Sequence, residues 1–286
     1  MKRPKSKTKA TVVRVVQGAA QTRRDVLATE EPLEIRLLSR AERRSVAVTM
    51  RTPGSDFELA AGFLFCEGIL GTRDDIERIS YCVDTDAEQR YNIVNVTLRG
   101  DLPDLRSLER HFYTSSACGV CGKANLEALE VRCAPLPQTF SVTPDLITSL
   151  PDKLRDTQGL FEATGGLHAA ALFTKEGELL ALREDVGRHN ALDKLLGWAF
   201  LENLLPLSEH IVLLSGRASF ELLQKSLAAG VQVVCAVSAP SSLAVSVAKE
   251  FDMTLIGFLR EERFNIYAGE TRILTAQSEE VAMPSP

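Results

Sequence analysis

The second half of the chain alternates between short apolar segments and longer segments of helical spacing. Residues 210–214, 231–237 and 254–259 have the length and apolar character of buried strands, while 220–229 and 242–251 have helical spacing. Continuous apolar strands that alternate with helices indicate a largely parallel sheet with helices on its faces. Upstream, residues 167–173 and 178–185 predict two further strands, followed by a helix at 190–200. The expected fold class is therefore α/β, with a mainly parallel sheet flanked by helices.

The first half has a different pattern and predicts a smaller mixed α+β part. A two-residue alternation indicates strands at 11–16, 33–38, 45–51 and 91–98. Ser55 and Glu58 have the spacing of a capping box, which predicts a helix beginning there. Three more helices are expected at the following ranges: 107–112, 123–130 and 145–155.

Prolines at 135, 137 and 144 mark the expected boundary between the halves. The predicted organisation has four parts: a disordered basic tail at 1–9, an N-terminal part at 10–134, a C-terminal domain at 144–275 and a flexible tail at 276–286.

Charge and composition exclude several classes of protein. Hydrophobic residues make up 45% of the chain, and no apolar run reaches the roughly 18 residues that a membrane span requires. The tail lacks the apolar core of a signal peptide, so a cytoplasmic location is expected. The net charge of −5 becomes −10 without the five cations of the tail, so a surface that coats nucleic acid is not expected. Six cysteines are too few for a disulfide scaffold in a chain of 286 residues.

Four polar loops come at the ends of predicted strands or at the starts of predicted helices. In an open α/β sheet, ligands bind outside the carboxyl ends of the strands, and helix N-termini and guanidinium groups bind phosphates there. The sequence therefore predicts an anion-binding edge, although serine and glycine also serve simply as caps and turns. The four loops are 183–190 (REDVGRHN), 215–219 (SGRAS), 238–242 (SAPSS) and 260–265 (REERFN).

The segment TSSACGVCGK places Cys118 and Cys121 three residues apart between two predicted helices. Lys123 and the positive end of the following helix favour the thiolate of Cys121. Four functions fit such a pair: a zinc site completed by Cys133 and a histidine, a zinc deaminase, a thiol-disulfide oxidoreductase, or a carrier of sulfane sulfur. The deaminase lacks support because no histidine stands in an H-x-E motif. The other cysteines stand singly among apolar residues and are expected to be buried thiols: Cys66, Cys82, Cys133 and Cys235.

Six sequence blocks in order resemble the formate dehydrogenase accessory sulfurtransferases, the FdhD family, over about residues 33–268. The blocks are SSACGVCGK at 115–123, TGGLHAAALF at 164–173, REDVGRHNALDK at 183–194, SGRASFELLQK at 215–225, SAPSSLAV at 238–245 and GFLREERFNIY at 257–267.

The resemblance implies a cytoplasmic, dimeric sulfurtransferase with a cytidine-deaminase-like core that holds no zinc. It implies that a cysteine desulfurase donates sulfur and that the acceptor is the molybdenum or tungsten bis-molybdopterin guanine dinucleotide cofactor of formate dehydrogenase. The implied sulfur carrier is Cys118, with Cys121 as its helper, whereas Lys123 and the positive end of the following helix favour Cys121 as the thiolate. No permanent metal is expected.

The resemblance also implies a cofactor-binding segment at Phe258, Leu259, Arg260, Glu261, Glu262 and Arg263. Glu261 and Glu262 stand where family members often have glycine. Independently of the resemblance, three of the four polar loops contain further candidate contacts for an anionic dinucleotide: Arg188, His189, Arg217 and Ser238. Asp185 is expected to pair with Arg188, and His168 to be a core residue with its hydrogen bonds satisfied. The alternative function is a cofactor-binding chaperone whose cysteines hold a structural zinc.

Overall fold

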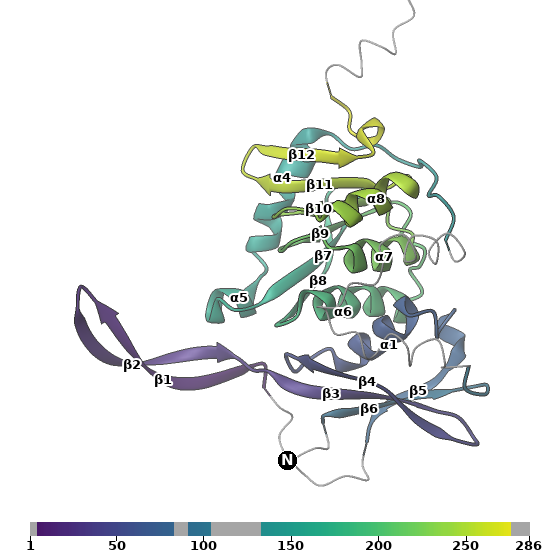
Figure 1. Cartoon of the computed structure of the whole chain (residues 1–286), viewed down its shortest axis with the longest axis horizontal. Helices are drawn as coiled ribbons and strands as arrows, with labels where there is room; N and C mark the ends of the chain where they lie inside the picture. The colour runs from purple at the N-terminus through teal and green to yellow at the C-terminus, as the bar shows by residue number, and fades with distance from the viewer. Residues whose placement is uncertain (1–4, 83–90, 104–132, 276–286) are drawn as a thin grey trace, which may run out of the picture.

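The computed structural model describes residues 5–82, 91–103 and 133–275. These residues form a two-stranded arm, a four-stranded sheet and a six-stranded sheet (Figure 1). Cys118, Cys121 and the helices expected at 107–112 and 123–130 lie outside the described residues. None of the helices in the described part is long and apolar enough to span a bilayer.

The arm is a hairpin of β1 (Lys7–Val16) and β2 (Ala19–Ala28), and it extends away from the rest of the molecule (Figure 1). Gln17 and Gly18 form its turn, both with positive φ. Strand β1 includes residues 7–9, which were predicted to belong to the disordered tail. The whole of β2 was missed because its sequence, AAQTRRDVLA, lacks a clear apolar alternation.

The four-stranded sheet has the order β4-β3-β6-β5. Its strands are β3 (Glu31–Leu38), β4 (Arg43–Arg51), β5 (Ile76–Tyr81) and β6 (Ile93–Leu98). Alternate residues of β3, namely Leu33, Ile35 and Leu37, are fully buried against α1 (Asp56–Cys66). A short 3-10 helix, η1 (Arg73–Asp75), precedes β5.

Helix α1 begins where it was predicted, but the expected capping box does not form. Ser55 has a left-handed backbone (φ 55°) and its side chain makes no capping hydrogen bond. Asp56 instead accepts from the backbone N–H of Gly54, and Glu58 pairs with Arg183 of the six-stranded sheet.

The six-stranded sheet has the order β12-β11-β10-β9-β7-β8. Its strands are β7 (His168–Thr174), β8 (Leu179–Asp185), β9 (His210–Leu214), β10 (Val233–Ala236), β11 (Thr254–Arg260) and β12 (Arg263–Ala268). Strands β8, β9, β10 and β11 point in one direction, whereas β7 and β12 point in the opposite direction. Parallel pairing is therefore limited to β9 with β10 and β10 with β11, and the other neighbours pair antiparallel. The prediction of a mainly parallel sheet is therefore wrong, and the sheet is mixed.

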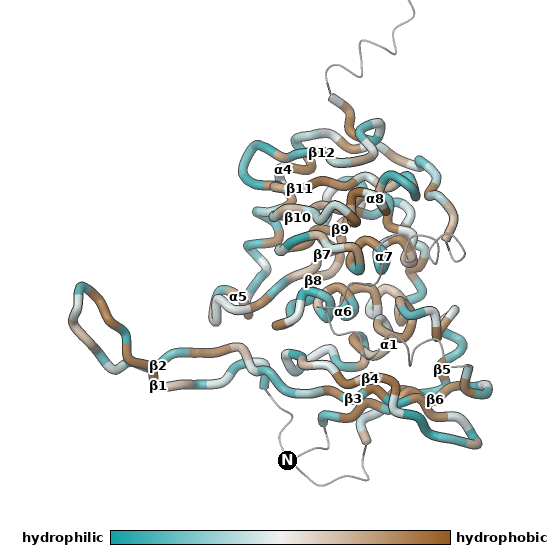
Figure 2. The backbone as a smooth tube through the Cα atoms, viewed as in Figure 1, coloured by the Kyte–Doolittle hydropathy of each residue, from teal (hydrophilic) through white to brown (hydrophobic). Residues whose placement is uncertain are grey.

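Helices cover both faces of this sheet. Alternate strand residues such as Leu172, Val212 and Val234 pack against α6 (Arg188–Leu201), α7 (Phe220–Ala228) and α8 (Ser242–Glu250). The residues between them, such as Phe173 and Leu213, pack against α4 (Pro144–Arg155). Figure 2 shows these strands as largely hydrophobic stretches between more hydrophilic turns. The helix α5 (Gly159–Thr164) follows α4, and η2 (Glu270–Arg272) follows β12.

Helices α1 and α6 join the two sheets (Figure 1). They cross at Gly62 and Gly197, where an added Cβ would collide with the backbone of the facing helix at Asp193 and Glu58 respectively. Only glycine allows this approach, so the two residues set how closely the four-stranded sheet packs on the six-stranded sheet. A cytidine-deaminase-like core and the division at 134–143 remain predictions.

Candidate functional site

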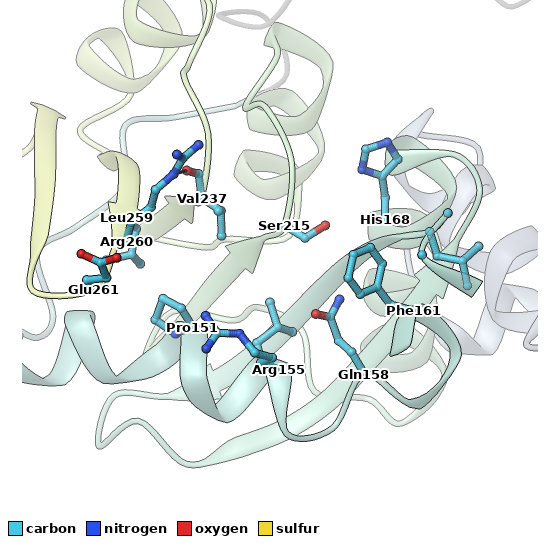
Figure 3. Close-up of a pocket in the computed structure, with 14 residues that line it drawn as sticks. Pro151, Arg155, Gln158, Phe161, His168, Ser215, Val237, Leu259, Arg260 and Glu261 are labelled. Atoms are coloured by element: carbon cyan, nitrogen blue, oxygen red, sulfur yellow. Dashed lines mark hydrogen bonds between the residues drawn. The ribbon is translucent and has the colours of Figure 1, made fainter. Parts of the chain in front are cut away.

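A cavity of about 680 Å³ opens at one edge of the six-stranded sheet, beside α4 and α5. From the sheet come His168, Ser215, Val237, Leu259, Arg260 and Glu261. From the helical side come Pro151, Leu154, Arg155, Gln158, Phe161 and the turn 165–167. Figure 3 shows Gln158, Phe161, Ser215 and His168 grouped on one side, with Arg260 and Glu261 on the other.

The strand order explains why these residues meet. Strands β9, β10 and β11 are parallel, so their carboxyl ends share one edge, and the antiparallel β7 brings its amino end to the same edge. The Ser215 hydroxyl accepts from the backbone N–H of Ala169 at 2.8 Å, which ties the end of β9 to the start of β7. The cavity therefore lies at the predicted binding edge, to which β8 also brings its carboxyl end, because β8 is antiparallel to β7.

The end of β11 has an unusual backbone. Phe258 and Glu261 both have positive φ, of 53° and 51°, which side-chain-bearing residues seldom adopt. The Phe258 N–H donates to the Ser238 carbonyl at 3.2 Å, so the third and fourth predicted loops touch. A Cβ at Gly257 would lie 2.8 Å from Pro240 Cδ, so glycine is required beside this bulge. Strained backbone of this kind is concentrated at functional sites.

Only part of the predicted cofactor-binding segment from Phe258 to Arg263 lines the cavity. Arg260 and Glu261 line the cavity, and Leu259 lines it while also packing fully buried in the core. Phe258 is 40% exposed, and Glu262 and Arg263 are exposed on the hairpin to β12, outside the cavity lining. Strand β12 itself occupies part of what was predicted as a loop.

A second group of basic side chains lies next to the cavity, at the start of α6 and in the loop between β9 and α7. Burial lowers the pKa of His168, and the positive charges of Arg188, His189 and Arg217 lower it further. His168 therefore stays neutral at neutral pH, while the guanidinium groups of Arg188 and Arg217 supply positive potential beside it. His168 is half-buried and lines the cavity, so it is not the enclosed core residue that was expected.

The four predicted loop residues Arg188, His189, Arg217 and Ser238 differ in their surroundings. His189 Nε2 lies 2.7 Å from a carboxylate oxygen of Glu221, and this hydrogen bond lowers the pKa of Glu221. The Nε atom of Arg188 is buried and has no hydrogen-bond partner among the described residues. Arg217 is exposed, and Ser238 is partly buried.

Asp185 does not pair with Arg188 as predicted. Its carboxylate is fully buried and lies 2.6 Å from the ammonium group of Lys194. It also accepts from the backbone N–H groups of Thr52 and Gly187, at 3.0 and 2.9 Å. Asp185 thus joins the six-stranded sheet to the chain after β4 and is a structural residue.

The described cysteines are free thiols. Cys66, Cys82 and Cys235 are buried, as predicted, whereas Cys133 is only partly buried and packs against the core. Desolvation raises the pKa of the Cys66 and Cys235 thiols, so both stay protonated at neutral pH. Among the described residues, no group of three or more histidine, cysteine or acidic side chains is placed to hold a metal ion.

The helical wall of the cavity was not predicted from the sequence. Arg155, Gln158 and Phe161 lie at the end of α4 and the start of α5, outside the four polar loops. The local sequence DTQGLFEATGG marks a helix end, but only the packing of α4 on the sheet brings these side chains to the edge.

Comparisons with known proteins identify relatives of this chain by sequence. A family model described as the FdhD/NarQ family matches residues 28–274. A protein of Streptomyces avermitilis named sulfur carrier protein FdhD is 55% identical over 269 residues, covering 92% of this chain and 94% of the relative. The protein of the same name from Sulfurisphaera tokodaii is 46% identical over 87% of this chain and 92% of its own length.

The architecture also matches a solved structure. The crystal structure of a protein from Desulfotalea psychrophila, described as a formate dehydrogenase accessory protein, superposes with a TM-score of 0.74 at 26% identity. The match covers 94% of this chain and 100% of that chain.

Proposed function

Because the chain belongs to the FdhD/NarQ family, we propose that it is a sulfur carrier that serves the maturation of formate dehydrogenase. In this proposal Cys118 receives sulfane sulfur from a cysteine desulfurase and delivers it to the molybdenum or tungsten bis-molybdopterin guanine dinucleotide. This cofactor is the substrate of the transfer and not a resident group of the protein. The protein works as a homodimer in the reducing cytoplasm.

The first step is a thiol exchange that moves one sulfur atom. The Cys118 thiolate attacks the terminal sulfur of the desulfurase persulfide, the S–S bond of the donor breaks, and the donor leaves as a thiolate. Cys118 then carries the persulfide.

The second step releases that sulfur to the acceptor. The Cys121 thiolate attacks the inner sulfur of Cys118, the bond to the terminal sulfur breaks, and hydrosulfide is released for the metal of the bound substrate. A Cys118–Cys121 disulfide remains, which a cellular dithiol reductant returns to two thiols.

The observation that carries the proposal is the cavity at the carboxyl edge of β9, β10 and β11. Arg155 and Arg260 line it, and the cluster of Arg188, His189 and Arg217 lies beside His168. A protein with a net charge of −5 must concentrate its cations locally to hold a multiply phosphorylated substrate. The six-stranded sheet meets this requirement at one edge, which supports an anionic dinucleotide as the acceptor.

Intact-mass spectrometry after incubation with cysteine desulfurase and cysteine tests the carrier role. The wild type should gain one sulfur atom that a thiol reductant removes, Cys118→Ala should gain none, and Cys121→Ala should retain the gain longer. Cys133→Ala, which alters a partly exposed cysteine, should behave as the wild type does. A wild type that gains no sulfur, or a Cys118→Ala variant that gains it normally, would overturn the proposal. Stoichiometric zinc lost in both Cys118→Ala and Cys121→Ala would instead support a chaperone with a structural zinc loop.

A further inference from the structure

No side chain of the β1–β2 arm belongs to the three hydrophobic clusters of the described residues. Val13 and Val15 of β1 are 65% and 64% exposed, and Val16 and Leu27 are also exposed. A two-stranded hairpin without a buried face is at best marginally stable in water. The arm is therefore expected to bury a face against a partner molecule.

The register of the hairpin gives the arm two different faces. On one face, two valines of β1 and the residues opposite them form an apolar patch near the turn: Val13, Val15, Ala20 and Thr22. Toward the body, the same face carries three cations and no carboxylate: Lys7, Lys9 and Arg24. Asp25 lies on the other face, 3.9 Å from Arg23. The first face, the valine face, therefore combines an apolar patch with three cations.

The charge and size of the arm suit an acidic protein surface. Residues 1–28 contain eight basic residues and one acidic residue, which leaves a net charge of −12 for the remainder of a chain whose total is −5. The arm therefore attracts an acidic partner. A nucleic acid fits less well, because the arm has no aromatic residue for stacking and the remainder of the chain repels phosphates. Residues 7–28 also reach the roughly 20–30 residues that one side of a standard protein interface uses.

The root of the arm adjoins the wall of the cavity. Lys7 Nζ donates to the Gly159 carbonyl at the start of α5, at 3.2 Å, and β2 packs against the same helix. Phe161 of α5 lines the cavity. Figure 1 shows the arm extending from the body beside α5. Ten extended residues per strand span about 33 Å, so a macromolecule that takes cargo from the cavity comes within reach of the arm.

We infer that the arm is the docking element for the protein that receives the cargo of the cavity. The apolar patch of the valine face packs on an apolar area of the receiver, and Lys9 and Arg24 lie against acidic residues around that area. The inference rests on the proposed function, in which the sulfurated cofactor passes to the apoenzyme of formate dehydrogenase. The cations raise the association rate and make it depend on salt, while the buried apolar patch slows dissociation.

Biolayer interferometry with immobilised, cofactor-free formate dehydrogenase tests the inference. Val15→Asp should weaken binding at least about tenfold, because it places a charge in the apolar patch. Lys9→Glu combined with Arg24→Glu should weaken binding at least about tenfold at low salt and should flatten its salt dependence.

Strand β4 offers matched controls for both substitutions. Val48→Asp alters a valine that is 68% exposed, and Arg43→Glu combined with Arg44→Glu alters two exposed cations. Both controls should bind the apoenzyme as the wild type does. All of the altered side chains are exposed, so every variant should keep the Tm of the wild type.

Sedimentation velocity detects a different occupant of the arm. The arm variants should keep the oligomeric state of the wild type, and a shift toward smaller species would show that the arm holds a second copy of this chain. That shift, unchanged binding in both arm variants, equal losses in the controls, or no binding by the wild type would each overturn the inference. The sulfur gain at Cys118 needs no receiver, so it should persist in Val15→Asp. A normal gain with arm-independent binding defeats the inference alone, and an absent gain in the wild type defeats the proposed function.

Discussion

The buried pair of Asp185 and Lys194 is expected to be the most sensitive charged contact near the site. Both side chains are at most 2% exposed, and Lys194 also donates to the Thr52 carbonyl at 2.8 Å. Lys194→Met would leave the Asp185 carboxylate buried without its cation, which typically costs about 3–5 kcal/mol. Urea unfolding of the variant should show this loss as a lower free energy of unfolding.

The matched control is Lys175→Met. Lys175 pairs with Glu209 at 2.7 Å, but the two side chains are 40% and 51% exposed, so water screens the pair. Its loss should leave the free energy of unfolding close to that of the wild type. Equal effects of the two substitutions would contradict the structural role assigned to Asp185.

The ion pair between Asp185 and Lys194 could not be predicted from the local sequence. Asp185 and Arg188 are three residues apart, which made them plausible partners, whereas Lys194 is nine residues away. Lys194 reaches Asp185 because α6 folds back along β8. The backbone N–H of Thr52, which follows β4 of the four-stranded sheet, donates to the same carboxylate. Tertiary contacts of this kind leave no local signal. The loop residues Ser215, Arg260 and Glu261 were predictable because the ends of parallel strands converge at one edge.

The crossing of α1 and α6 depends on Gly62 and Gly197. A methyl group at Gly62 would meet the carbonyl oxygen of Asp193 and the backbone N of Gly197, neither of which can move independently of its helix. Gly62→Ala should therefore destabilise the protein by about 1–3 kcal/mol or more, although alanine is the better helix former. Thermal or urea unfolding measures this loss.

Gly100→Ala provides the control for that substitution. An added Cβ at Gly100 has no atom within 4 Å among the described residues, so the variant should unfold as the wild type does. A Gly62→Ala variant as stable as Gly100→Ala would mean that the two helices do not approach as closely as described.

The elements with strong periodic signals were predicted, and the elements with weak signals were not. The strands at 33–38 and 210–214 and the helix at 145–155 were found close to their observed bounds. Strands β2 and β5 were missed because charged residues interrupt their alternation, as in IERISY. Strand β12 was missed because RFNIYA follows β11 after a tight turn at 261–262. The order and direction of the strands could not be read from periodicity, which explains the wrong expectation of a mainly parallel sheet.

At the scale of the whole molecule, the two sheets share buried contacts that should make them unfold together. Phe65 packs against the core clusters of both sheets. Asn190 of α6 donates to the Met50 carbonyl at 2.7 Å, and Arg183 of β8 pairs with Glu58 of α1. Neither sheet can lose its structure without exposing these groups, so a single cooperative transition is expected.

Two probes can follow the sheets separately in urea. Trp198, the single tryptophan, lies in α6 beside the six-stranded sheet, and its fluorescence reports that part. Cys82 is 1% exposed at the end of β5, so pulsed thiol labelling of this residue reports the four-stranded sheet. The two midpoints should coincide in the wild type. In Gly62→Ala, which weakens the contact between the sheets, Cys82 should become reactive at a lower urea concentration than that at which the Trp198 fluorescence changes. Separate midpoints in the wild type would show that the sheets are independent units, and the cavity edge would then be stable without the four-stranded sheet.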